Sequence, residues 1–529
     1  MNASSLKVNL QKCKEGASII VNTAGFDEKN LRLAKYETNP LLDNSLSAYN
    51  VIAIDISGEV TEILKSTTLS PKNIERTKNI FALGMTYWLF DRSLETTEKW
   101  LYDKFKKKQD IYEANLKVLR AGLEYAKQND IMNVQYKVED ARLQPGFYRN
   151  ITGNEACAIG LVVAAHKAKL PLYLGSYPIT PATEILHFIS GYKDYGVKVL
   201  QAEDEIAGIS SSIGASFAGY LAATTTSGPG LSLKVEAIGL AVILELPLVI
   251  IDVQRAGPST GLPTKPEQAD LFMAIWGRHG EGPVPVIAAS SSADCFDMTI
   301  EAARIALKYM TPVILLTDGY IAQGTNPFRV PDIEKLPDIS VKFATDSETF
   351  QPYRRDPITL ARPWAVPGTP GLEHRIGGLE KEDITGMVSH DPLNHQRMVN
   401  LRQQKVDDIA NDIPLATVEG EQEGDLLIVS WGGTFGAVQD AFIKLRSEGK
   451  KVSFCHLSYL YPFPRNLGDI LSKFKRILVP ELNAGQLKTV LEAKFLRPIL
   501  GLNKVQGLPL KAFEVEDKVN QLLNLKEVN

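Results

Sequence analysis

Apolar runs alternate with helix-length segments between residues 153 and 326. Six runs read as strands, at 170–174, 198–201, 221–225, 248–253, 284–288 and 312–316. Helix-length segments separate them, and the helix after the third run begins beyond a Gly-Pro-Gly turn. Because such alternation places helices on the faces of a sheet, it predicts a parallel, doubly wound α/β domain.

The segments on either side of this region have other patterns. Residues 1–130 combine strand-like runs at 18–21 and 51–56 with long helical patterns, and 131–152 read as a linker. Residues 327–415 are rich in proline and lack long apolar runs, which indicates an extended connector. Residues 416–529 predict a smaller α/β domain, with strands at 426–430, 452–455 and 477–479 and helices at 435–445, 467–474 and 486–495.

Composition narrows the class of protein without defining it. The 529 residues are 44% apolar and 23% charged, as in soluble proteins of several domains. A net charge of -4 provides no basic surface for DNA or RNA, so no nucleic-acid partner is expected. The most apolar helix candidate, 231–246, is too short to span a bilayer and carries Lys234 and Glu236. With no signal peptide, we expect a cytoplasmic protein without a membrane segment.

The cysteines do not form a metal-binding pattern. Cys13, Cys157, Cys295 and Cys455 lie far apart, and no CxxC pair occurs. Iron–sulfur and zinc sites need clustered cysteine ligands, so we expect no metal on this chain. Any electron-carrying cluster would lie on another chain.

Four polar loops follow predicted strands of the doubly wound domain. They span residues 177–181, 203–205, 226–230 and 255–261. Open α/β sheets bind their ligands at the carboxyl ends of the strands, which makes this edge the candidate site.

Taken singly, each loop has a structural explanation too. Thr180 and Pro181 suit the N-cap and first turn of a helix. Glu205 could complement a helix dipole, although the small residues after it would also let a flat ring approach. Arg255 could form a rim salt bridge, or it could bind a carboxylate with two parallel hydrogen bonds.

Taken together, these segments resemble the α subunit of 2-oxoacid:ferredoxin oxidoreductases. The resemblance rests on 153–156, 177–181, 203–205, 226–230, 255–270, 277–281 and 481–487, and it covers roughly residues 10–529. It implies that 153–326 form the pyrimidine-binding domain for thiamine diphosphate and that 416–529 form a transketolase-C-like domain. Residues 1–130 resemble the later part of the γ domain that this family often fuses ahead of its α subunit, without its Gly-rich opening.

The resemblance also implies roles for individual residues. Glu205 matches the catalytic glutamate that hydrogen-bonds the aminopyrimidine. Arg255 and Thr180 match the residues that bind the substrate carboxylate. The remaining cofactor contacts would come from Tyr177, Pro178, Gly228 and Pro229. Thiamine diphosphate would be shared with a β subunit, which would carry Mg²⁺ and a 4Fe–4S cluster.

The implied activity is coenzyme-A-dependent oxidative decarboxylation of 2-oxoglutarate, with ferredoxin as electron acceptor and a β subunit as obligatory partner. The distal carboxylate of 2-oxoglutarate needs a second cation, for which Arg278, His279 and a residue of the β subunit are candidates. Three alternatives stay open, one of which is an enzyme of the same superfamily with different chemistry, such as a transketolase or an NAD-linked 2-oxoacid dehydrogenase. The substrate could be pyruvate or a branched-chain 2-oxoacid, or the chain could be a non-catalytic assembly subunit.

Overall fold

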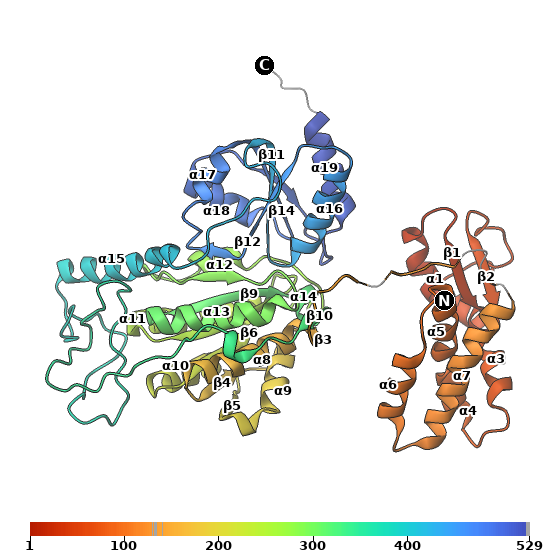
Figure 1. The fold of residues 1–529 in the computed structure, drawn as a ribbon, viewed down its shortest axis with the longest axis horizontal. Helices are drawn as coiled ribbons and strands as arrows, with labels where there is room; N and C mark the ends of the chain where they lie inside the picture. Colours follow the sequence, from red (N-terminus) through yellow and green to blue (C-terminus); the bar gives the residue numbers. More distant parts are fainter. Residues whose placement is uncertain (130, 132–134, 140, 525–529) are drawn as a thin grey trace. The chain divides into compact units, whose positions relative to one another are not determined.

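The computed structural model describes residues 1–129, 131, 135–139 and 141–524, which divide into two compact units, 1–145 and 146–529 (Figure 1). The first unit contains the parallel strands β1 (Ser18–Asn22) and β2 (Asn50–Ile54), as the two strand-like runs predict. Its helices are α1 (Ala3–Asn9), α2 (Glu28–Leu33), α3 (Ile56–Leu64), α4 (Pro71–Arg76), α5 (Lys78–Leu89), α6 (Glu95–Phe105) and α7 (Gln109–Gln128).

Two glycines bring α5 and α7 together in this unit. A Cβ on Gly84 would lie 2.1 Å from the Leu119 carbonyl oxygen, and one on Gly122 would lie 2.1 Å from that of Phe81. Neither position has room for a side chain, so the two helices pack backbone to backbone beside the apolar core of the unit.

A seven-stranded sheet forms the centre of the second unit. Its order is β13-β8-β9-β7-β6-β4-β5, and all neighbours are parallel except β13, which pairs antiparallel with β8. The strands are β4 (Leu172–Ser176), β5 (Val197–Gln201), β6 (Leu221–Thr226), β7 (Leu248–Gln254), β8 (Val286–Ala288), β9 (Pro312–Asp318) and β13 (Tyr459–Tyr461). The predicted doubly wound sheet is confirmed.

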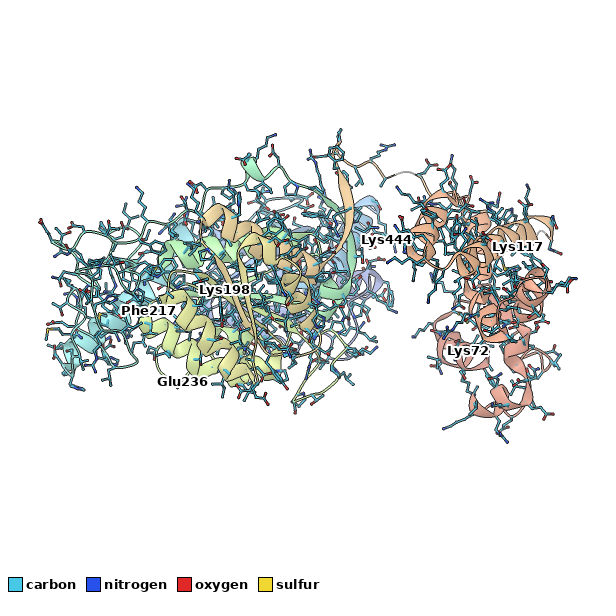
Figure 2. The ribbon with its side chains drawn as sticks, turned by 90° about the horizontal axis from the view of Figure 1, so that it is seen from below. Lys72, Lys117, Lys198, Phe217, Glu236 and Lys444 are labelled. Carbon is cyan, nitrogen blue, oxygen red and sulfur yellow. The ribbon has the colours of Figure 1, made fainter. Side chains whose placement is uncertain are left out.

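The strands of this sheet are buried on both sides, so both faces have to be shielded from water, and helices cover each of them. One core cluster includes α8 (Gly153–Ala168), α9 (Thr183–Ser190) and α13 (Asp294–Tyr309). The other includes α10 (Glu205–Phe217), α11 (Gly228–Leu244) and α12 (Leu271–Trp276). Phe217 ends α10 and Glu236 lies on α11 (Figure 2).

The smaller domain has a four-stranded parallel sheet of order β12-β11-β14-β15. Its strands are β11 (Gly424–Trp431), β12 (Ser453–Leu457), β14 (Phe474–Glu481) and β15 (Leu500–Asn503). Its helices are α16 (Phe435–Ser447), α17 (Leu467–Ser472), α18 (Gln486–Phe495) and α19 (Ala512–Asn524). One face of the sheet shares its apolar cluster with α10 and α11, so the two sheets belong to one packed unit.

Several elements lie where the sequence pattern indicates none, among them β13, β15 and α19 of the C-terminal region and three in the expected linker and connector. β3 (Tyr148–Thr152), inside the expected linker, pairs antiparallel with β10 (Thr325–Arg329), next to α14 (Gly319–Gln323). α15 (Pro392–Asp408) lies inside the expected connector, where the Asp391 side chain accepts hydrogen bonds from Leu393 N and Asn394 N. The division into five segments therefore stays a prediction at the level of individual boundaries.

The connector is attached to the doubly wound domain by buried ion pairs. Glu245, which follows α11, bonds to both Arg355 and Lys405, and Arg355 bonds to Asp383 at 2.7 Å. The two cations hold the pKa of Glu245 at about 2, against the effect of burial.

None of the helices in the described part of the chain combines the length and apolar character of a bilayer-spanning segment.

Candidate active site

All four polar loops lie at one edge of the seven-stranded sheet, since β4, β5, β6 and β7 are parallel and each loop follows one of them. Two contacts join the loops. Arg255 Nη1 donates a hydrogen bond of 2.6 Å to the Thr180 carbonyl oxygen. A Cβ on Gly230 would lie 2.7 Å from Glu205 Oε1. The structure thus brings the predicted residues together at the edge where open α/β sheets bind ligands.

Glu205 is the first residue of α10, and its side chain is buried. Its neighbour Asp204 is the N-cap and accepts a hydrogen bond of 2.7 Å from Ala207 N. Because Asp204 caps the helix, capping does not account for Glu205. Among the residues that the structure describes, no donor bonds to the Glu205 carboxylate. A buried carboxylate with open acceptor positions suits a ligand that brings its own N–H group.

Lys234 is a buried residue beside the site that sequence reasoning did not assign to it. It lies on α11, is 0% exposed, and its Nζ donates a hydrogen bond of 2.9 Å to the Glu205 carbonyl oxygen. Burial lowers the pKa of Lys234 to about 8, while Glu205 and Asp204 act in the opposite direction. The available signal was a lysine in an otherwise apolar helix, since a buried cation needs a partner.

Arg255 directly follows β7 and is also buried. In the described part of the chain it forms no ion pair, so the rim salt bridge is absent. Its Nε has no partner, and its guanidinium is held by the single bond to the Thr180 carbonyl. Since guanidinium groups carry five donors, several N–H groups remain for a ligand.

Thr180 does not cap a helix. α9 begins at Thr183, and its N-cap is Ala182, which provides no side-chain bond. The Thr180 side chain is exposed, and its hydroxyl has no hydrogen bond within the described residues. Tyr177 on the same loop is 37% exposed. Both side chains are accessible at the edge of the sheet.

The N-terminus of α11 has the features of a cofactor pocket. Ser227 is its N-cap, but its hydroxyl is buried without a partner and caps nothing. Gly228 and Gly230 leave no room for a Cβ, and Pro229 lies between them. An unpartnered hydroxyl at Ser227 and an unpartnered carboxylate at Glu205 fit a flat heterocycle with an amino group and ring nitrogens. The aminopyrimidine of thiamine diphosphate is such a group.

A pair of buried aspartates lies behind this helix end. Asp252, on β7, and Asp270, just before α12, are within hydrogen-bonding reach of each other. Burial and the neighbouring Asp270 raise the pKa of Asp252 well above its usual range. Burial also raises the pKa of Asp270, to about 6. Sequence reasoning included Asp252 in an apolar strand and overlooked it, although a carboxylate in such a run is itself a signal.

Arg278, a candidate for the distal carboxylate, has its donors bonded to backbone carbonyl groups. Its three nitrogens donate to the carbonyl oxygens of Gly282, Ala274 and Ile275 at 2.7, 2.9 and 2.5 Å, so it caps the end of α12. His279 lies beside Gly239 and lines a cavity of about 480 Å³ that none of the four loops contributes to. The structure brings neither residue to the carboxyl edge.

The smaller domain supports the segment that follows the Arg255 loop. Gln268 accepts a hydrogen bond from Leu482 N and donates one of 2.8 Å to the Trp431 carbonyl oxygen. Asn483 Nδ2 donates to the Gln268 carbonyl oxygen at 2.7 Å, and Gln486 Nε2 to that of Ala269 at 2.7 Å. These side-chain bonds connect the two sequence motifs 265–270 and 481–487.

The doubly wound domain, with a buried glutamate at its carboxyl edge and a smaller parallel α/β domain packed on it, agrees with the thiamine-diphosphate-dependent class that the sequence resembles. Three family models match the chain. They describe the thiamine diphosphate-binding domain of pyruvate flavodoxin/ferredoxin oxidoreductases at residues 164–390, a pyruvate ferredoxin/flavodoxin oxidoreductase domain at 1–125, and core domain II of pyruvate:ferredoxin oxidoreductases at 424–508.

Individual relatives agree with this class. A 2-oxoglutarate oxidoreductase subunit KorA from Mycobacterium tuberculosis is 48% identical over 97% of this chain and 79% of its own length. A 2-oxoglutarate synthase subunit KorA from Archaeoglobus fulgidus is 34% identical over 64% of this chain and 88% of its own length. A solved 2-oxoglutarate:ferredoxin oxidoreductase from Magnetococcus marinus, with 2-oxoglutarate, coenzyme A and succinyl-CoA bound, is similar at a TM-score of 0.87 and 33% identity. That similarity covers 98% of this chain and 87% of the other. The chain belongs to the 2-oxoacid:ferredoxin oxidoreductase family.

Proposed function

We propose that this chain is the α subunit of a 2-oxoglutarate:ferredoxin oxidoreductase and is active only with a β subunit. The reaction converts 2-oxoglutarate, coenzyme A and two oxidised ferredoxins into succinyl-CoA, CO₂, two reduced ferredoxins and a proton. The observation that carries the proposal is the unpartnered Glu205 carboxylate beside the Gly228–Gly230 backbone. The names of the relatives from Mycobacterium tuberculosis and Archaeoglobus fulgidus support 2-oxoglutarate as the substrate.

Residues of this chain would hold the pyrimidine half of thiamine diphosphate. Bound thiamine diphosphate supplies the carbon nucleophile and the electron sink for 2-oxoacid decarboxylation. Glu205 would accept a hydrogen bond from the pyrimidine ring and stabilise the protonated ring nitrogen. Tyr177, Pro178, Gly228 and Pro229 would line the ring, and Lys234 would hold the start of α10 in place.

Arg255 would bind the 1-carboxylate of the substrate, and the Thr180 hydroxyl would bond the same group or the adjacent 2-oxo oxygen. Charge-assisted bonds of this kind fix the orientation of the reacting carbon as well as its affinity. The distal carboxylate would then need a cation from elsewhere, because the donors of Arg278 are used within its own helix end.

The remaining components would come from partners. No group of three His, Cys, Asp or Glu residues suited to a metal occurs in the described part of this chain, and of its cysteines only Cys157 and Cys295 lie close together. We therefore assign Mg²⁺ and the 4Fe–4S cluster to the β subunit. Ferredoxin would accept the electrons, coenzyme A the acyl group, and the cytoplasm would be the site of the reaction.

Reconstitution with the β subunit tests this function. The two chains are co-expressed and purified, and coenzyme-A-dependent reduction of a viologen dye is measured with 2-oxoglutarate, pyruvate and a branched-chain 2-oxoacid. We expect the highest kcat/KM for 2-oxoglutarate. A preference for pyruvate or a branched-chain acid would change the substrate but keep the class. No reduction with any 2-oxoacid, in a complex that also fails to bind thiamine diphosphate, would support a non-catalytic assembly subunit.

A further inference from the structure

The aspartate pair Asp252–Asp270 has an unusual shortage of hydrogen-bond donors. Both carboxylate oxygens of Asp252, and Oδ2 of Asp270, are buried without a donor. A Cβ on Gly228 would lie 2.6 Å from Asp270 Oδ1, so the pair lies directly against the N-terminus of α11. Two ionised carboxylates cannot satisfy one another, whereas one protonated and one ionised carboxyl form an O–H···O⁻ bond.

The charges around the pair add a second constraint. Arg255 acts on Asp270 as a positive charge and Glu267 as a negative one, and no other titratable group acts on either aspartate within the described residues. Glu267 is buried near the same loop and accepts backbone hydrogen bonds from Gly257 and Gly507. With all three carboxyls ionised, the acidic groups would outnumber the Arg255 guanidinium and repel an anionic substrate.

We propose that Asp252 and Asp270 share one proton at the working pH and act as positioning residues for Arg255. The pair then carries one negative charge instead of two. One charge holds the guanidinium in place and complements the partial positive charge at the start of α11, and it leaves Arg255 free to attract the carboxylate of a 2-oxoacid. The link to the substrate rests on the function proposed above, whereas the shared proton rests on the side-chain geometry alone.

Infrared difference spectroscopy on the complex with its β subunit tests the shared proton directly. The spectra are recorded at about pH 7.5, which lies above the ordinary pKa of every carboxyl. In the difference spectrum of wild type minus Asp252→Asn, we expect the variant to have lost one carbonyl stretch of a protonated carboxylic acid. In wild type minus Asp270→Asn, a carboxylate band should disappear instead. Loss of carboxylate bands in both comparisons would mean that both aspartates are ionised, and would overturn the proposal.

Steady-state kinetics test the positioning role. When the pair loses its shared proton at alkaline pH, the KM of the wild-type complex for 2-oxoglutarate should rise by about tenfold, while kcat changes little. A tenfold rise in KM corresponds to a free-energy difference of about 1.4 kcal/mol. Asp252→Asn should abolish the rise, and Asp297→Asn, an exposed aspartate on α13, should retain it. An equal rise in wild type and Asp252→Asn would contradict the role.

The two measurements separate failure of this inference from failure of the proposed function. If the wild-type complex does not turn over any 2-oxoacid, the function proposed above is wrong, and the infrared bands still decide whether the proton is shared. If Asp252→Asn does not fold, the pH dependence of the wild-type KM provides the test, and a KM that does not rise at alkaline pH would overturn the proposal.

Discussion

Arg255 is held by one hydrogen bond and lies near a buried carboxyl pair. Its guanidinium donates to the Thr180 carbonyl oxygen, forms no ion pair within the described residues, and acts as a positive charge on Asp270. The planar group can form two parallel bonds to a carboxylate, which a lysine ammonium cannot. We expect Arg255→Lys to lower kcat/KM by about 10- to 100-fold, as for the loss of a charge-assisted bond of about 1.5–3 kcal/mol.

The loss should be similar for every 2-oxoacid that the complex uses, because all of them carry the 1-carboxylate. Kinetics of the variant with 2-oxoglutarate and with a monocarboxylic 2-oxoacid check this. If only 2-oxoglutarate is affected, Arg255 binds the distal carboxylate and the orientation proposed here is reversed.

Asp252 should also affect stability as a function of pH. Its pKa is raised in the folded chain, so the folded state binds more protons than the unfolded state above about pH 4, the ordinary pKa of an aspartate. The contribution of Asp252 to stability therefore falls as pH rises, by at most about 1.4 kcal/mol per pH unit for one proton. Asp252→Asn removes this loss. The melting temperature of the variant relative to wild type should therefore be higher at about pH 8 than at about pH 5. A difference in melting temperature that does not depend on pH would argue against a raised pKa.

At the residue scale, the sequence predicts the location of the site from where residues stand after strands, and not from the chemistry of each side chain alone. Glu205, Arg255 and Thr180 follow apolar strands, and parallel strands bring such positions to one edge. Lys234 and Asp252 were missed because both lie within apolar stretches, where pattern alone assigns a core role. The partners that make them informative, the Glu205 carbonyl and Asp270, come from other elements and are known only from the fold.

At the scale of elements, the start of α10 depends on α11. The buried Lys234 bonds the Glu205 carbonyl oxygen, and Gly230 lets the two helices approach. Lys234→Met keeps the volume but removes this bond. We expect a loss of about 1–3 kcal/mol in the free energy of unfolding, because the buried Glu205 carbonyl loses a charged donor from α11.

The same substitution should weaken thiamine diphosphate binding in the complex, since Glu205 is no longer held. Titration of the complex with the cofactor, followed by protein fluorescence, measures this loss. Lys167→Met, which changes an exposed-face lysine of α8 bonded to the Ile333 carbonyl, is the matched control. Equal affinities in wild type and Lys234→Met would show that Lys234 does not position Glu205.

The six strands of the doubly wound domain could be predicted because each is a short apolar run between helix-length segments. α15 could not, because prolines dominate the composition of its surroundings, although Asp391 followed by Pro392 is a good helix start. β3, β10 and β13 depend on partners distant in sequence: Tyr148 pairs with Arg329, and Tyr459 with Ile287. Local periodicity contains no information on such pairings.

At the scale of the whole molecule, the function proposed above makes this chain one half of a composite active site. It has residues suited to the pyrimidine ring, and its described residues include no metal-binding cluster. We expect the purified chain alone to show no iron–sulfur absorbance and no reduction of a viologen dye with 2-oxoglutarate. Absorbance spectra and iron analysis of the isolated chain provide the check. A stoichiometric 4Fe–4S cluster on it would contradict the assignment of the cluster to the β subunit.

The central claim is that Glu205 activates thiamine diphosphate in the complex of this chain with its β subunit. The most direct measurement is kcat for 2-oxoglutarate in Glu205→Gln, compared with wild type and with Glu203→Gln, an exposed neighbour on the same loop. Loss of a positioned proton-transfer group predicts a fall of about 10²–10⁴-fold in Glu205→Gln with an unchanged melting temperature, and activity near wild type in Glu203→Gln. If kcat in Glu205→Gln stays within a few-fold of wild type, Glu205 is a helix-end residue and the site proposed here is wrong.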